Sequence, residues 1–354
     1  MSRKPVVAGG KPKYQLCVVI PVRNEGRYLG QTLDQVYLQD YPMDALEVVV
    51  VDGGSDDDTR QVAESYKNRF GSLKVLDNPR RFASAGKNVG IKNSSASYIL
   101  FLNGRTYIPS KNFLSDIVAI FESSEADCLC RPRPLTPPDI NEFERAIAVC
   151  RGSFLGHDPG SVAYSDFEGV TDPTSSGAVY RREVFEKVGM FDEEFDICND
   201  VDFNHRVKVQ GLKSYISPKL KVFLYPRSTI QQLWHHMNRI GMGRYKFAAK
   251  HNIFSPLQWF AAVSIIGLCL MLLLSLISRP FFEVFRTILA FYVLVVIGYS
   301  LVLYLREKRL GCLLYGPVIF PAIHFGMGLG VLKALAREML PKRPSGSQGL
   351  TGGP

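Results

Sequence analysis

The chain has 354 residues, enough for one sizeable soluble domain and a small membrane region, and its net charge at pH 7 is +9. The positive balance favours an anionic partner such as phospholipid headgroups or nucleotide phosphates, but the basic residues are scattered, so we expect no nucleic-acid partner. Seven cysteines at irregular spacing exclude a disulfide framework, and Cys128 and Cys130 lack the second pair that a zinc site needs, so we expect buried, reduced thiols.

The first 250 residues have the alternating pattern of an α/β domain. Residues 1–13 contain no apolar run, so we expect a flexible terminus without a signal peptide, followed by a domain over 14–250. Apolar, β-branched runs predict strands over 16–21, 46–52, 74–78 and 98–103, and apolar residues at helical spacing predict helices at Leu29 to Tyr37, 57–69, 85–94 and 111–122. Strands that alternate with helices indicate a mostly parallel, Rossmann-like sheet with helices on both faces.

Polar residues follow each predicted strand. They are Asn24 and Glu25, Asp52, Asn78 and Arg80, and Asn103 with Arg105. Each alone is typical of a turn or a helix cap, but the carboxyl ends of parallel strands share one sheet edge, where ligands bind. The chain has neither a P-loop lysine motif nor GxGxxG, which removes the main support for an ATPase or a dinucleotide-binding enzyme.

The region 251–340 is predicted to be a small transmembrane helical region. The stretches 257–277 and 287–305 are uncharged and have the length of a membrane span. A third apolar stretch, 312–332, contains two prolines, and a full crossing would place Lys333 and Arg337 on the far side from a cytosolic domain, against the positive-inside rule. A crossing and a re-entrant or interfacial segment both stay open. The tail 341–354 is rich in Gly, Pro and Ser and is predicted to be disordered.

Five motifs follow one another along the chain: PVRNE (21–25), VDGGSDDDT (51–59), AGKNVGI (85–91), SSGAVYRREVFEKVGMFDEEF (175–195) and NDVDFNHRV (199–207). In this order they resemble those of the inverting family 2 glycosyltransferases, which bind nucleotide sugars on a GT-A fold. Within that family the chain most resembles the succinoglycan-type membrane glucosyltransferases. The similarity covers about residues 14–250.

This resemblance implies donor-binding roles for Pro21, Arg23, Asn24, Glu25, Asp52, Gly54, Lys87, Asn88, Asn103 and Arg105. Asp52 would accept a hydrogen bond from the base, typically uracil, although a helix-capping aspartate also fits this sequence. Gly54 would allow close backbone approach to the ligand.

The acidic motif implies that Asp200 is the general base, because inverting transfer needs one carboxylate to take the acceptor proton. Asp202 is the alternative base. A following aromatic and basic segment would hold the pyrophosphate and the acceptor through Trp234, His236, Arg239 and Arg244. An interfacial amphipathic helix is the competing interpretation of that segment.

The chain departs from the family where an acidic triplet normally holds a divalent metal, Mg or Mn, on the donor. Here the triplet is Asn103-Gly104-Arg105, and Arg105 cannot bind a cation. We expect no metal ligands at this position, and Arg105, with Arg80 or Arg81 as a candidate companion, would replace the metal. The loss of the triplet also leaves open a catalytically inactive, nucleotide-sugar-binding subunit of a membrane glycan-assembly complex.

The sequence therefore predicts a membrane-bound transferase that adds a single sugar from a UDP-type donor to a polyprenyl-phosphate-linked acceptor in polysaccharide or exopolysaccharide biosynthesis. Processive synthases of the family have more spans and a QxxRW motif, which this chain lacks. We expect a multi-pass protein of the inner (plasma) membrane with a cytoplasmic catalytic domain, in contact with membrane lipid and with other glycan-assembly proteins. The stretch 131–175, rich in Pro and Gly, allows no assignment.

Overall fold

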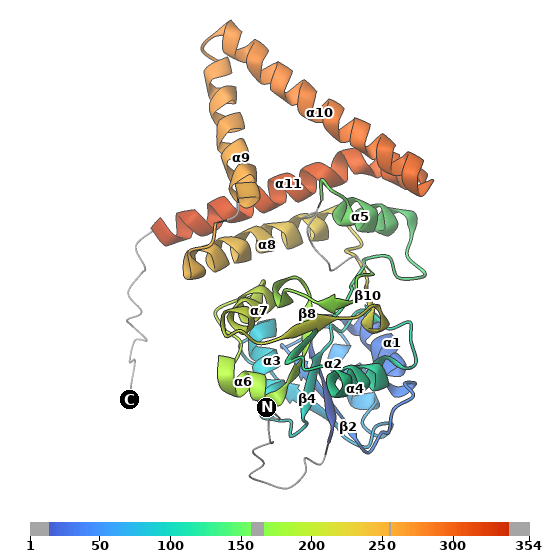
Figure 1. The fold of residues 1–354 in the computed structure, drawn as a ribbon. Helices are drawn as coiled ribbons and strands as arrows, with labels where there is room; N and C mark the ends of the chain where they lie inside the picture. Colours follow the sequence, from blue (N-terminus) through green and yellow to red (C-terminus); the bar gives the residue numbers. More distant parts are fainter. Residues whose placement is uncertain (1–13, 157–165, 255, 340–354) are drawn as a thin grey trace, which may run out of the picture.

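The computed structural model describes residues 14–156, 166–254 and 256–339, so the predicted flexible terminus 1–13 and tail 341–354 lie outside it. An α/β domain forms the lower part of the molecule in Figure 1, and long apolar helices form the upper part. The domain contains an eight-stranded sheet in the order β3-β2-β1-β4-β8-β6-β9-β7.

The first four strands are parallel and confirm the predicted doubly wound half. They are β1 (Leu16–Val22), β2 (Leu46–Asp52), β3 (Leu73–Asp77) and β4 (Tyr98–Phe101). The helices between and after them are α1 (Gly26–Tyr37), α2 (Thr59–Ser65), α3 (Ala83–Lys92) and α4 (Phe113–Ser123). Helix α2 is shorter than predicted, and β4 ends at Phe101, two residues before the predicted end at Asn103.

Successive residues of these strands pack against opposite layers. Val18 and Val48 pack with apolar residues of α1 and α4, whereas Val19 and Val49 pack with Ile91 of α3 on the other face. Both faces of the sheet are therefore covered, as the continuous apolar runs require.

The other half of the sheet is mixed. Strand β8 (Gly177–Arg181) is antiparallel to β4 and to β6 (Cys128–Cys130), and β9 (Ser214–Ile216) joins β6 in parallel and β7 (Gly169–Val170) in antiparallel. A separate pair joins β5 (Thr106–Tyr107) to β10 (Phe223–Leu224). The remaining helices of this part are α5 (Glu142–Gly152), α6 (Arg182–Val188), α7 (Asn199–Val209) and α8 (Ile230–His251), with short 3-10 turns at Pro173–Ser175 and Pro218–Leu220.

Three apolar helices follow: α9 (Pro256–Ser275), α10 (Arg279–Glu307) and α11 (Leu310–Met339). By length and composition α10 and α11 could each cross a membrane, and α9 contributes a shorter apolar helix, Trp259–Ser275. Figure 1 shows α9 and α10 as a hairpin that rises from the rest, whereas α11 lies across its base alongside α8. Helix α11 continues through Pro317 and Pro321, so the prolines do not break it.

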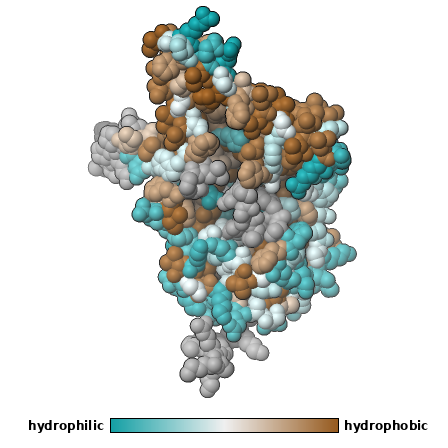
Figure 2. Space-filling view, turned by 45° about the horizontal axis from the view of Figure 1, so that its top comes forward, coloured by the Kyte–Doolittle hydropathy of each residue, from teal (hydrophilic) through white to brown (hydrophobic). Residues whose placement is uncertain are grey.

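Helix α11 packs on the rest of the chain along its length. Near its start, the Tyr315 ring packs edge-on against Phe143 of α5 at 5.0 Å. Farther on, Gly330 lies so close to α8 that a Cβ there would be 3.0 Å from the Cα of Gly241. Figure 2 shows hydrophobic residues over the helices at the top and hydrophilic residues over the domain below. Of the seven cysteines, Cys269 on α9 is exposed and the others are buried free thiols, as expected except for that one.

Candidate active site

A cavity of about 1570 Å³ begins at the carboxyl ends of the parallel strands and continues upward between the apolar helices. Its floor includes the segments 21–25, 103–105 and 196–201, and its upper wall includes apolar residues of α9 and α10 such as Leu268 and Phe291. The sequence-predicted residues that line it are Pro21, Arg23, Asn24, Glu25, Lys87, Asn103, Arg105, Asp200, His236, Arg239 and Arg244.

The turn after β1 forms one end of the floor. Asn24 has a φ of 55°, a left-handed conformation that Asn tolerates. Its Oδ1 accepts from the Asp56 N–H at 2.9 Å, and its own N–H donates to Ser55 Oγ at 3.0 Å. Asn78, after β3, also lines the cavity, and its Oδ1 is a buried acceptor without a partner in the described part of the chain. The Asn24 groups are thus satisfied within the turn, whereas the Asn78 amide oxygen is left for a ligand.

Asp200 lies in the first turn of α7, next to three cations. Its Oδ2 is 3.5 Å from NH1 of Arg133, and the side chain is 34% exposed. Burial raises the pKa of Asp200, but Arg133, Lys87 and Arg244 outweigh that effect and hold the pKa below its usual value. Asp200 is thus ionised at neutral pH and able to accept a proton.

Lys87 joins α3 to α7 beside this carboxylate. Its Nζ donates to Asn199 Oδ1 at 2.7 Å and lies 4.5 Å from the centre of the Phe191 ring. Burial lowers the pKa of Lys87 to about 8. The ammonium therefore carries most of its charge at neutral pH but loses it in mild alkali.

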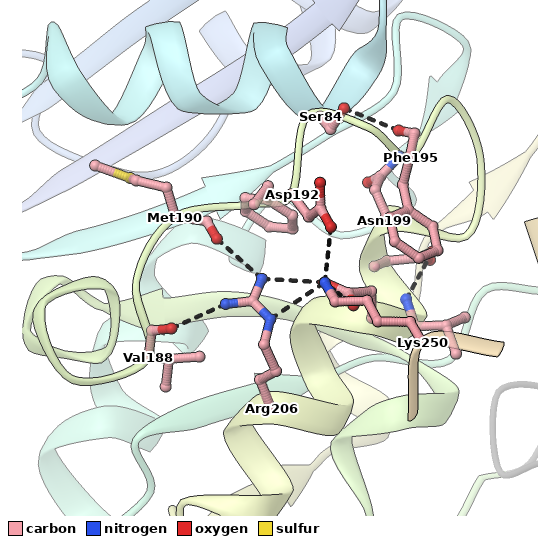
Figure 3. Close-up of polar contacts among 12 residues, drawn as sticks. Ser84, Val188, Met190, Asp192, Phe195, Asn199, Arg206 and Lys250 are labelled. Atoms are coloured by element: carbon pink, nitrogen blue, oxygen red, sulfur yellow. Dashed lines mark hydrogen bonds and ion pairs between the residues drawn. The ribbon is translucent and has the colours of Figure 1, made fainter. Parts of the chain in front are cut away.

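Asp202, two residues after Asp200, faces away from the cavity. Its buried carboxylate binds Arg206 at 3.1 Å, Lys250 at 2.8 Å and His251 at 2.8 Å. Figure 3 shows Arg206 also reaching the carbonyl groups of Val188 and Met190, and both bonds are 2.9 Å long. Asp202 thus ties α7 to the end of α8.

Four more predicted residues are absent from the described cavity lining: Asp52, Gly54, Asn88 and Trp234. The Asp52 carboxylate accepts from the N–H and hydroxyl of Ser55 at 3.1 and 2.6 Å, so it closes the turn after β2 and does not cap α2, which begins at Thr59. Asn88 binds the carbonyl of Phe191 at 2.9 Å and Glu193 at 2.8 Å, and Trp234 packs in the apolar contact of α5, α8 and α11.

Four arginines, Arg105, Arg151, Arg227 and Arg239, surround His236, and we call these five residues the arginine cluster. Arg105 Nε is 3.8 Å from Glu25 Oε1, and Arg239 binds Asp196 through two bonds of 2.9 and 2.8 Å. Burial, reinforced by the four guanidinium groups, holds the pKa of His236 well below its usual value, so the ring is neutral.

Local structure explains how distant segments supply this cluster. An N-terminal capping box between Asn141 and Glu144 starts α5, whose last turn carries Arg151. Glu144 also accepts from the Ser228 hydroxyl at 2.7 Å, next to Arg227. Burial lowers the pKa of Arg227 to about 10.

These arginines do not suit a divalent cation. The position of the family's acidic triplet supplies the Asn103 amide and the Arg105 guanidinium, and the nearby Glu25 faces Arg105. In 14–156, 166–254 and 256–339 no three His, Cys, Asp or Glu side chains gather as metal ligands would. The donor set is that of an anion site.

Sequence reasoning missed Arg131, Arg133, Arg151 and Arg227. Arg131 is 5% exposed, its NH2 donates to the Phe101 carbonyl at 2.8 Å, and burial lowers its pKa to about 9. Three of the four lie in the stretch 131–175, where neither periodicity nor a motif identified them. Of the proposed companions of Arg105, Arg80 binds Glu193 at 2.7 Å, whereas Arg81 lines the cavity next to Gly54.

Comparisons with known proteins agree with this fold. Residues 17–189 match the Glycosyl transferase family 2 domain. The succinoglycan biosynthesis protein ExoA of Rhizobium meliloti is 25% identical over 74% of this chain and 78% of its own length. The dolichyl N-acetyl-alpha-D-glucosaminyl phosphate 3-beta-D-2,3-diacetamido-2,3-dideoxy-beta-D-glucuronosyltransferase of Methanococcus voltae is 25% identical over 61% of this chain and 68% of its own length.

Among solved structures, a mannosyltransferase from Pyrobaculum calidifontis in complex with GDP-Man and Mn²⁺ has a TM-score of 0.58, with 17% identity over 95% of this chain and 92% of its own. The S. aureus protein TarS in complex with UDP-GlcNAc has a TM-score of 0.51, with 17% identity over 93% of each chain. Both share the fold. The domain match and the order of the motifs identify residues 17–189 as a family 2 glycosyltransferase domain, and the structural neighbours share its GT-A fold.

Proposed function

We propose that the protein transfers one sugar, with inversion, from a UDP-type donor to a lipid-linked acceptor at the cytoplasmic face of the inner membrane. The observation that carries the proposal is the continuity of the cavity from the Asp200 carboxylate to the apolar surfaces of α9 and α10. An acceptor with a polar head and a hydrocarbon tail matches both ends of such a cavity. A polyprenyl phosphate carrying a sugar is the acceptor that we favour. The name of the Methanococcus relative describes a dolichyl-linked sugar phosphate.

In the proposed reaction Asp200 takes the proton of the acceptor hydroxyl as its oxygen attacks the anomeric carbon. The bond from that carbon to the donor phosphate breaks, and its electron pair leaves with the nucleoside diphosphate. Arg133 and Lys87 hold the pKa of free Asp200 low. An anionic donor offsets these cations, which makes Asp200 a stronger base once the donor has bound.

The donor would lie with its nucleoside at the turn after β1, near Asn24 and Asn78, and with its sugar near Lys87 and Asp200. The structural neighbours that were solved with GDP-Man and with UDP-GlcNAc support this class of donor. The family resemblance favours uridine over guanosine as the base.

The arrangement of the apolar helices supports a membrane hairpin formed by α9 and α10. Helix α8 carries Arg239, Arg244, Lys246 and Lys250, so it cannot lie within hydrocarbon. Helix α11 runs alongside α8 (Figure 1), and its close backbone contact at Gly330 fixes it there. We therefore infer that α11 lies at the membrane interface and that α9 and α10 cross the bilayer.

This topology keeps Lys333 and Arg337 of α11 on the side of the catalytic domain, as the positive-inside rule favours. Three apolar helices are also few for a channel that conducts a growing polymer, which supports the addition of a single sugar. Other proteins of glycan assembly would then extend the product.

The test is transfer of radiolabel from a panel of UDP- and GDP-sugars into organic-extractable lipid by membranes that contain the protein. We expect label in lipid with one or a few UDP-sugars. Label in a water-soluble product alone would contradict the lipid-linked acceptor. Donor binding without transfer from any sugar in the panel would favour the inactive, nucleotide-sugar-binding subunit.

A further inference from the structure

We propose that the arginine cluster holds the diphosphate of the donor and neutralises the leaving group, so that transfer requires no divalent metal. The inference rests on the proposed function and deepens it, because it assigns the groups that act on the donor's phosphates. It departs from the family resemblance, which implies a cation at the Asn103–Arg105 position.

Two nitrogen atoms of the cluster lack a hydrogen-bond partner. Nε of Arg227 and Nδ1 of His236 are buried and have no hydrogen-bond partner among the residues that the structure describes. Buried polar groups are normally satisfied, so such atoms indicate a missing ligand. Both residues line the cavity together with Arg105. Oxygen atoms of a bound anion would satisfy the guanidinium, and the neutral imidazole donates when Nδ1 carries its proton.

The charges of the cluster also indicate an anion. Arg105 lies 3.8 Å from Glu25 and Arg239 pairs with Asp196, whereas Arg227 forms no ion pair among the residues that the structure describes. Guanidinium groups bind phosphate oxygens through two parallel bonds and keep their charge at any physiological pH. Such a group suits the phosphates of a nucleoside diphosphate.

A divalent cation would be repelled at the same place. The side-chain oxygen that Asn103-Gly104-Arg105 offers is that of the Asn103 amide, and the neighbouring carboxylate of Glu25 lies 3.8 Å from the Arg105 Nε. As the bond from the anomeric carbon breaks, negative charge grows on the departing phosphate oxygen. Fixed guanidinium groups stabilise that charge without rearrangement during the step.

The test is calorimetric binding of UDP and UMP to the purified full-length protein in EDTA, with and without added Mg²⁺ or Mn²⁺. We expect wild-type protein to prefer UDP over UMP in EDTA, with little change when metal is added. Arg227→Gln should weaken UDP binding by roughly 10- to 100-fold, the effect of losing a charge-assisted bond, and leave UMP binding less affected.

Arg80→Gln is the matched control, because Arg80 is an exposed arginine that pairs with Glu193 outside the cluster. The Arg80→Gln protein should prefer UDP over UMP as strongly as wild-type protein does. UDP binding that needs metal, or an Arg227→Gln protein that keeps the wild-type preference, would overturn the proposal. If the protein binds GDP and not UDP, the donor base of the proposed function is wrong, and GDP against GMP tests the cluster in the same way. Binding of neither diphosphate in EDTA overturns the cluster's role.

Discussion

Gly330→Ala tests the contact between α8 and α11, on which both the site and the inferred topology depend. A Cβ at Gly330 would lie 2.9 Å from the carbonyl carbon of Asn238 and 3.0 Å from the Cα of Gly241. These are backbone atoms, so no rotamer change relieves the clash. The carbonyl oxygen of Asn238 would lie closer still, so the helices must separate by more than the roughly 0.5 Å that would raise 2.9 Å to the 3.4 Å of an ordinary contact.

Overpacking of this kind costs about 1–3 kcal/mol of unfolding free energy, and each kcal/mol lowers Tm by roughly 2–4 °C in domains of 150–250 residues. We therefore expect a Tm several degrees lower, measured by intrinsic fluorescence of the full-length protein in nanodiscs. Because α8 also carries His236 and Arg239, donor binding should weaken as well.

Gly298→Ala on α10 is the control, since a Cβ there would meet no described atom within 4 Å. Alanine is favoured over glycine by about 1 kcal/mol inside a helix, so this variant should melt at or above the wild-type temperature. If the Gly330→Ala and Gly298→Ala proteins have the same Tm, α11 does not pack against α8 as described.

Three further predictions concern single side chains. Burial lowers the pKa of Lys87 to about 8, so kcat/KM should fall in an alkaline limb near pH 8. Lys87→Arg should remove this limb, because a guanidinium stays charged there, and an unchanged limb would exclude Lys87 as its source. Asp202→Asn should destabilise the fold by about 3–5 kcal/mol at neutral pH, since it breaks a buried ion pair. Burial raises the pKa of Asp202, but Lys250 and His251 lower it overall. The stabilisation is therefore complete above the pKa that Asp202 has in the unfolded chain, and it is lost as the pH falls. A Tm difference between wild type and Asp202→Asn that persists unchanged in acid would contradict that role. In sealed vesicles Ser278→Cys, between α9 and α10, should react with an impermeant maleimide from the side opposite to Arg337→Cys, and reaction from one side would refute the hairpin.

The sequence allowed the parallel half of the fold to be predicted because its strands are covered on both faces. That burial selects continuous apolar runs such as 46–52, which can be recognised without a partner sequence. The mixed half, with β6, β8 and β9, consists of short strands whose order in the sheet depends on contacts between distant segments. Local pattern carries no information on that order.

Where a motif fixes a position on an element, as with Asp200 and Lys87, the sequence predicted residues that the structure places in the cavity lining. The two aspartates of NDVDF show the limit: they are two positions apart on a helix, roughly 200° around its axis, so only one can face the cavity. Deciding which one requires the position of α8. Arg151 and Arg227 were missed because the fold brings them together from separate segments, and neither belongs to a local pattern.

The most direct test of the account compares wild-type and Asp200→Asn protein in single-sugar transfer and in donor binding. The asparagine keeps the shape of the side chain but cannot take the acceptor proton, and loss of a general base typically costs about 10²- to 10⁴-fold in rate. We predict a loss of that size in kcat, with a donor Kd close to that of wild type or tighter, because one negative charge beside Arg133 is removed. Near-normal turnover in Asp200→Asn would contradict the assignment of Asp200 as the base and the mechanism built on it.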